Sequence, residues 1–236
     1  MAKKKTRGTI DNWFDLNVDE ETRTIYMGSV GTDYDGNETG VDTFMAEFFI
    51  KGMHILESTS SNPITIIMNN PGGDWYHGMA IYDAIKTSRS HCTIFVYGHA
   101  MSMGSIILQS ADKRIMMPNS RFMIHYGTDG GYRHAKISEK WADEGKRICW
   151  EMENLYIERL IEKEKLMGEG YIETTINNLI SEITKYEIPK KKIKFKISKT
   201  DQSEDIRAAL QHMLNFDYIL TPKQTIDLGL ADEIYA

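Results

Sequence analysis

Residues 93–108 read TIFVYGHAMSMGSIIL, and this stretch joins a predicted strand to a predicted helix through a turn of small residues. The β-branched and aromatic residues 93–97 are typical of a buried strand. The apolar residues 106–108 begin a buried helix, so Ser102 lies at the strand-to-helix turn. The amide groups of a first helical turn have no partner within the helix, and they face any anion beside them. Ser102 therefore occupies a position that suits a nucleophile.

Two other predicted strands also end in polar residues. Residues 64–68 run into NNPGGD, in which Gly72 and Gly73 permit backbone conformations closed to other residues and could form an anion-binding nest. A third apolar strand ends at His125. A serine, a histidine and a donor-rich glycine turn at strand ends are the parts needed for acyl transfer.

Strands and helices alternate along most of the chain. The pattern predicts strands over residues 24–27, 64–68, 93–97, 114–117 and 122–125. It predicts helices over residues 42–58, 78–87, 102–110 and 137–167. Repeated strand-helix units imply an α/β fold with a mostly parallel sheet and right-handed crossovers. The polar strand ends would then meet at one edge of that sheet.

Composition narrows the class of protein. A chain of 236 residues that is 41% hydrophobic can bury a real core, and a formal net charge of -6 argues against nucleic acid as a partner. Two cysteines imply no disulfide framework and favour a reducing compartment. We find no signal peptide, membrane segment or metal-ligand spacing, so we expect a cytoplasmic protein without membrane partner, metal or cofactor.

Four blocks of sequence resemble, in the same order, the ATP-dependent Clp protease proteolytic subunit family, ClpP. The blocks are NPGG at 70–73, GMAIYD at 78–83, GHAMSMGS at 98–105 and PNSRFMIH at 118–125. Weaker similarity covers residues 23–28 and 218–232. The resemblance implies a ClpP/crotonase-like α/β fold with a protruding handle helix. It also suggests an N-terminal segment 1–22 and a protease domain 23–236, with the handle at about 127–168 and an insertion at about 169–204.

The resemblance assigns roles to four residues. It makes Ser102 the nucleophile and His125 the general base, with an oxyanion hole formed by the backbone amides of Gly73 and Met103. The implied function is a serine endopeptidase that hydrolyses unfolded proteins or short peptides inside a ring-shaped chamber. Heptameric rings, stacked as a tetradecamer, would be served by a separate AAA+ unfoldase, because the sequence contains no phosphate-binding loop.

The third member of the triad is the point at which this chain departs from the family pattern. Aligning the C-terminal blocks places Met213 where the family has its catalytic aspartate, and methionine cannot orient an imidazole. Asn215 or Asp217 could do so if the loop shifts, although a local structural role is favoured for Asp217. We therefore expect weak peptidase activity. The alternatives are a catalytically impaired ring subunit with a structural or regulatory role, and an acyl-thioester enzyme of the crotonase type.

The insertion contains one regular pattern. Residues 192–197 read KIKFKI, which alternates lysine with apolar residues and predicts a strand that follows a turn at Pro189. An edge strand protected by lysines is favoured over a site for an anionic partner.

Overall fold

The computed structural model describes residues 9–29, 31–32, 35–128, 135–183 and 193–236. Residues 1–8 of the N-terminal segment, residues 129–134 at the start of the predicted handle and residues 184–192 of the insertion lie outside this description. The chain forms two compact units, Met1–Phe122 with Ala231–Ala236 and Met123–Leu230, which are described in turn.

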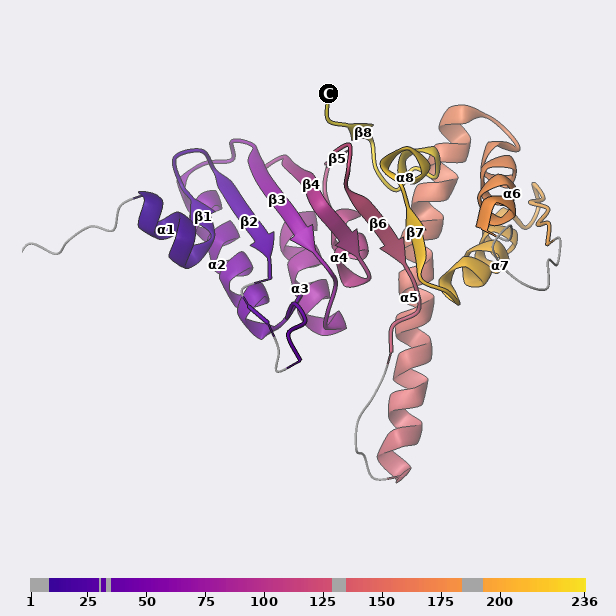
Figure 1. Ribbon diagram of the computed structural model, residues 1–236, viewed down its shortest axis with the longest axis horizontal. Coiled ribbons are helices and arrows are strands. Elements are labelled where there is room, and N and C mark those ends of the chain that lie inside the picture. The colour runs from indigo at the N-terminus through magenta and orange to yellow at the C-terminus, as the bar shows by residue number, and fades with distance from the viewer. Residues whose placement is uncertain (1–8, 30, 33–34, 129–134, 184–192) are drawn as a thin grey trace, which may run out of the picture. The chain divides into compact units, whose positions relative to one another are not determined.

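The first unit is built on a sheet with the strand order β1-β2-β3-β4-β5-β8 (Figure 1). Its strands are β1 (Val18–Asp19), β2 (Thr24–Gly28), β3 (Ile64–Asn70), β4 (Cys92–Met101), β5 (Lys113–Met116) and β8 (Glu233–Ile234). The pair β1–β2 is antiparallel, whereas β2 to β5 and β8 pair in parallel with their neighbours along this order. The predicted, mostly parallel sheet is therefore confirmed.

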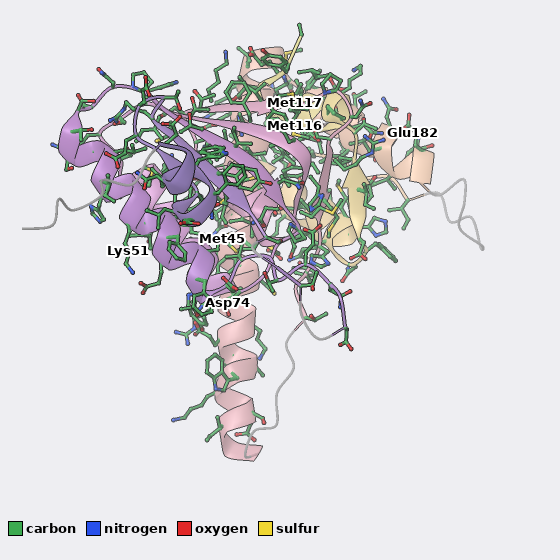
Figure 2. All side chains as sticks on the ribbon, turned by 60° about the vertical axis from the view of Figure 1, so that its left-hand side comes forward. Met45, Lys51, Asp74, Met116, Met117 and Glu182 are labelled. Carbon is green, nitrogen blue, oxygen red and sulfur yellow. The ribbon has the colours of Figure 1, made fainter. Side chains whose placement is uncertain are left out.

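Helices connect the parallel strands of this unit. These are α2 (Thr43–Thr59), α3 (Trp75–Lys86) and α4 (Met103–Leu108), whereas α1 (Thr9–Leu16) precedes the first strand. Asp42 and Asp74 cap α2 and α3 by accepting hydrogen bonds from backbone amides in the first turn of each helix. In Figure 2, Met45 and Lys51 both lie on α2, where Met45 is buried and Lys51 pairs with Glu47 on the exposed face.

The pairing of β3 with β4 is irregular close to the turn that carries Ser102. Met68 pairs with Val96, but Asn70 pairs with Ala100, so β4 has extra residues between these two pairs. Such an irregularity bends the strand locally and changes the direction in which its end points. It aligns the end of β3, where the glycine turn begins, with the last residues of β4.

The second unit is mostly helical and contains the long helix at the position predicted for the handle. Its elements are α5 (Ala135–Met167), α6 (Tyr171–Ile183), α7 (Gln202–Leu214), β7 (Tyr218–Leu220) and α8 (Pro222–Asp227), with β6 (Arg121–Ile124) leading into it. Helices α5, α6 and α7 contact one another, and β6 pairs with β7. The sequence patterns did not predict α6, α7 or α8.

The predicted strand over 192–197 is wrong. Within the part of the chain that the structure describes, residues 193–198 form no strand and pair with none. Polar side chains of α6 bind this backbone instead: Asn177 donates to the Phe195 carbonyl at 2.8 Å and accepts from the Phe195 amide at 2.9 Å. Glu173 accepts from the Ile197 amide at 2.7 Å. The alternation of burial is present, since Phe195 and Ile197 are partly buried and Lys196 is exposed. It does not specify which groups bind the backbone of this segment.

Among the described helices, none combines the length and the hydrophobicity that crossing a membrane requires.

Candidate active site

Ser102 sits in a constrained backbone conformation at the turn between β4 and α4. Its φ of 50° and ψ of -123° lie in a region that residues other than glycine rarely adopt. Ser102 is the N-cap residue of α4, yet its side chain makes no capping hydrogen bond. Ser105 stabilises this turn, because its amide and its hydroxyl both donate hydrogen bonds to the Ser102 carbonyl, at 3.0 and 2.6 Å. Strain of this kind is characteristic of functional turns.

The glycine turn after β3 lies against this serine. A Cβ atom added to Gly72 would stand 2.5 Å from the Ser102 Cβ and 3.1 Å from the Met103 amide nitrogen, so the two turns touch. Asn70 is fully buried and fixes the turn by accepting a 2.9 Å hydrogen bond from the Gly72 amide. Sequence reasoning missed this role of Asn70, although asparagine before a glycine pair is a recognised signal for such a turn.

The two amides predicted for the oxyanion hole, those of Gly73 and Met103, both belong to the first unit. Val41 bridges Gly73 in parallel, donating to the Gly72 carbonyl at 2.6 Å and accepting from the Asp74 amide at 2.9 Å. In a parallel bridge of this register, the amide of Gly73 itself points away from Val41. Met103 is the first residue of α4, where the helix provides no acceptor for its amide.

Gly72→Ala is expected to lower activity, because the added methyl group overlaps the Ser102 side chain at a φ of 109°. We predict a loss of peptide hydrolysis of about a hundredfold or more, comparable to removing an oxyanion donor. Gly31→Ala, which has nothing within 4 Å of the new methyl group, is the matched control and should keep wild-type activity. Equal activities of both variants would contradict this description of the turn.

His125 and Asp217 form a hydrogen-bonded pair in the second unit. The His125 Nδ1 atom lies 2.8 Å from the Asp217 Oδ1 atom. The side chain of His125 is 22% exposed, whereas that of Asp217 is 74% exposed in the single chain. A carboxylate only accepts hydrogen bonds, so the pair places the proton of a neutral imidazole on Nδ1 and leaves Nε2 as an acceptor.

The chain builds this pair from the ends of two neighbouring strands. His125 follows β6 directly, Asp217 precedes β7 directly, and these strands are paired. Next to His125, the Tyr126 amide donates to the Leu214 carbonyl at the end of α7, at 2.8 Å. The turn after α7 is closed by the Phe216 amide, which donates to the Met213 carbonyl at 3.2 Å. Asp217 is thereby brought beside the imidazole.

The expectation that Met213 stands beside His125 is wrong. Met213 is fully buried on α7 with Ile206, Leu210 and Leu214, and its side chain is part of the helical core. Asp217, for which a local structural role was favoured, takes the position next to the imidazole, while Asn215 ends α7 as its C-cap. Because Asp217 lies beside His125, Met213 gives no reason to expect weak activity.

Met213→Asp is expected to destabilise the protein, because the new carboxylate would be buried among apolar side chains without a partner. We predict a loss in the free energy of unfolding of about 3 kcal/mol or more. Met213→Leu, which conserves volume, should cost less than about 1.5 kcal/mol. The midpoints of urea unfolding measure both changes, and a stable, more active Met213→Asp protein would contradict the assignment of Asp217.

Metal-ligating and thiol side chains do not supply an alternative centre in the described residues. Within those ranges, no group of three or more histidine, cysteine, aspartate or glutamate side chains could hold a metal ion. Cys92 is buried, and burial raises the pKa of its thiol. Cys149 lies on α5, where burial and the nearby Glu153 carboxylate also raise the thiol pKa. Neither thiol is activated as a nucleophile.

The first unit thus carries a serine turn with a glycine turn beside it on an α/β sheet, and the second unit carries a histidine-carboxylate pair. The family profile described as Clp protease matches residues 37–167. The chain belongs to the Clp protease family.

Individual relatives agree with this assignment over part of their length. The chain is 39% identical over 95 residues to an ATP-dependent Clp protease proteolytic subunit of Deinococcus radiodurans. It is 33% identical over 121 residues to subunit 2 of Pseudomonas aeruginosa. The matches cover 39% and 50% of this chain and 47% and 60% of these relatives, so the chain spans about half the length of the curated relatives it matches. A chloroplastic subunit 3 of Arabidopsis thaliana is 41% identical over 114 residues, 46% of this chain and 34% of the relative.

A solved structure extends the similarity to nearly the whole chain. The structure of a ClpP1 mutant from Listeria monocytogenes has a TM-score of 0.58 and 25% identity, and the match covers 92% of both chains. The ClpP/crotonase-like fold expected from the sequence is thus confirmed.

Proposed function

We propose that this chain is a serine endopeptidase subunit of the Clp type. Ser102 is the nucleophile, His125 is the general base and Asp217 orients it, and the amides of Gly73 and Met103 form the oxyanion hole. The observation that carries the proposal is the 2.8 Å pair of His125 and Asp217, which supplies the carboxylate that Met213 could not. The domain is proposed to extend over residues 23–236, with the handle and the insertion included.

The proposed reaction has two halves. The Ser102 hydroxyl attacks the peptide carbonyl while His125 Nε2 takes its proton, and the oxyanion accepts hydrogen bonds from the two amides. The imidazolium then gives its proton to the leaving amine, which departs and leaves an acyl group on Ser102. Water, deprotonated by His125, hydrolyses this ester and restores the free serine. The Asp217 carboxylate stabilises the imidazolium in each half.

The proposed assembly is a heptameric ring, with two rings stacked as a tetradecamer and polypeptides supplied by a separate AAA+ unfoldase. It is supported by the exposed apolar residues of α5, among them Trp141, which is 38% exposed, and Trp150, which is 58% exposed. A cytoplasmic location is supported by two cysteines that are both free thiols. Native mass spectrometry should show a large ring, and a stable monomer at micromolar concentration would contradict the assembly.

The silent-subunit alternative was based on a missing carboxylate, and the position of Asp217 removes that basis. The thioester alternative requires an oxyanion hole without a nucleophile and base, so it does not account for the histidine-carboxylate pair. Purified full-length protein should hydrolyse a fluorogenic unstructured peptide and should not hydrolyse an acyl thioester at a matched rate. Thioester hydrolysis without peptide hydrolysis would overturn the proposal.

A further inference from the structure

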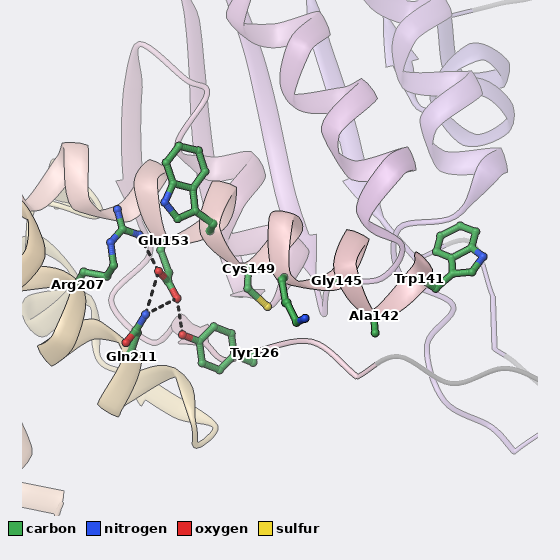
Figure 3. A pocket seen from close by; sticks show the side chains of 10 residues that line it. Tyr126, Trp141, Ala142, Gly145, Cys149, Glu153, Arg207 and Gln211 are labelled. Atoms are coloured by element: carbon green, nitrogen blue, oxygen red, sulfur yellow. Dashed lines mark hydrogen bonds and ion pairs between the residues drawn. The ribbon is translucent and has the colours of Figure 1, made fainter. Parts of the chain in front are cut away.

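A polar cluster centred on the buried Glu153 lies next to the histidine-carboxylate pair and is not part of it. The cluster consists of Tyr126, Glu153, Arg207 and Gln211, and it closes one end of a groove along α5 (Figure 3). The side chains of Glu153 and Arg207 are 5% and 13% exposed, so both charges are largely removed from water. Sequence reasoning did not identify any of these four residues.

Glu153 is the centre of the cluster. Its Oε1 atom accepts from the Tyr126 hydroxyl at 2.5 Å, and its Oε2 atom accepts from Arg207 at 2.7 Å. Gln211 donates to both oxygens, at 3.2 and 3.3 Å. Burial and the Glu153 carboxylate raise the pKa of Tyr126, so its hydroxyl remains a donor. A buried carboxylate with this many donors has a fixed geometry, because losing any of them leaves charge unpaired.

The partners of Glu153 belong to the two chain segments that carry the catalytic pair. Tyr126 follows His125 directly, and its own amide is bonded to Leu214, the last residue of α7. Arg207 and Gln211 lie on α7, and Asp217 follows the end of that helix. A single carboxylate on α5 therefore holds the segment of the imidazole and the helix that leads to its orienting acid.

We propose that Glu153 is a positioning residue. By binding Tyr126 and α7, it keeps His125 and Asp217 within hydrogen-bonding distance of each other. The inference rests on the proposed function, because the distance between His125 and Asp217 affects the rate only if His125 acts as the base. It assigns to the long helix α5 a direct influence on the rate of the chemical step. Glu153 does not touch the substrate, so it should affect kcat and leave KM unchanged.

The test uses two variants of the cluster and two matched controls in the full-length protein. Glu153→Gln removes the charge, and Tyr126→Phe removes only the hydroxyl that reaches Glu153. The control Glu164→Gln alters another buried carboxylate of α5, which instead binds the amides of Gly170 and Ile172. The control Tyr171→Phe makes the same chemical change in α6, outside the cluster. Peptide hydrolysis gives kcat and KM, and crystal structures give the distance from His125 Nδ1 to Asp217.

Both cluster variants should lower kcat by about tenfold or more at an unchanged KM, since small displacements of a catalytic group are this costly. The controls should stay within about twofold of wild type, because their changes do not reach the pair. The His125–Asp217 contact should be lost or lengthened in the cluster variants only. Unchanged kcat and an intact contact in both variants would overturn the inference, and Tyr126→Phe decides the matter if Glu153→Gln fails to fold.

The two proposals fail in different ways. If wild-type protein hydrolyses no peptide, the proposed function is wrong, but the crystallographic distance still tests the positioning by Glu153. If wild-type protein is active and the cluster variants are equally active, only the positioning role is overturned.

Discussion

Ser102→Ala is expected to reduce peptide hydrolysis to background, a loss in kcat on the order of a millionfold, as when a serine protease loses its nucleophile. The reason is that Ser105, the other hydroxyl of this turn, is buried and donates to the Ser102 carbonyl, so it cannot take over the attack. The substitution keeps the Cβ atom of Ser102, so the fold should be unchanged. Initial rates with a fluorogenic peptide measure the effect.

Ser110→Ala is the matched control for this experiment. Ser110 is buried just after α4, and its hydroxyl donates to the Ile107 carbonyl at 2.7 Å. Losing this bond should cost about 1 kcal/mol in the free energy of unfolding and leave the rate unchanged. Activity that survives in Ser102→Ala would exclude serine catalysis at this turn.

Asp217→Asn is expected to have the second largest effect. An amide can donate to Nδ1 and so favour the tautomer in which Nε2 carries the proton and cannot act as a base. A buried aspartate contributes about ten-thousandfold in the well-studied serine proteases, but the exposed carboxylate of Asp217 stabilises the imidazolium less. We therefore predict a loss in kcat of about a hundredfold to a thousandfold at an unchanged KM.

Asn215→Ala is the control for Asp217, because Asn215 lies in the same turn and its side chain is exposed. It should retain activity within about twofold of wild type. If Asn215→Ala abolished activity while Asp217→Asn did not, the carboxylate would have no role in orienting His125.

The strands and helices of the first unit could be predicted because their patterns are long and periodic. The predicted strand over 64–68 matches β3 (Ile64–Asn70), and the predicted helix over 42–58 matches α2 (Thr43–Thr59). Element ends were less certain, since α3 begins at Trp75, before the predicted residue 78. Asp74 caps that helix and would have indicated the earlier start.

The third member of the triad could not be aligned because the insertion precedes it. The spacing of Ile206, Leu210, Met213 and Leu214 is that of a buried helix face, and this pattern would have placed Met213 in the core of α7. Asp217 stands directly before the strand β7, in the same way that His125 directly follows β6. Two polar residues at paired strand ends were the available signal, but β7 has only three residues and is too short to show a period.

The contacts of the backbone of residues 193–198 also depend on tertiary structure. Alternation of lysine with apolar residues fits any extended chain with one buried side, whether its backbone is bound by a strand or by side chains. Here Asn177 and Glu173 on α6 bind the backbone, and neither residue is distinguished in the sequence from other polar residues of an amphipathic helix.

Labelling with a fluorophosphonate, followed by peptide mass spectrometry, tests the central claim most directly, because the reagent reacts with serines that a neighbouring base activates. The account predicts one adduct per chain, on Ser102, with labelling abolished in Ser102→Ala and strongly slowed in His125→Ala and Asp217→Asn. An adduct on another serine, or no adduct on the folded and assembled protein, would contradict the assignment of Ser102, His125 and Asp217 as a serine peptidase triad.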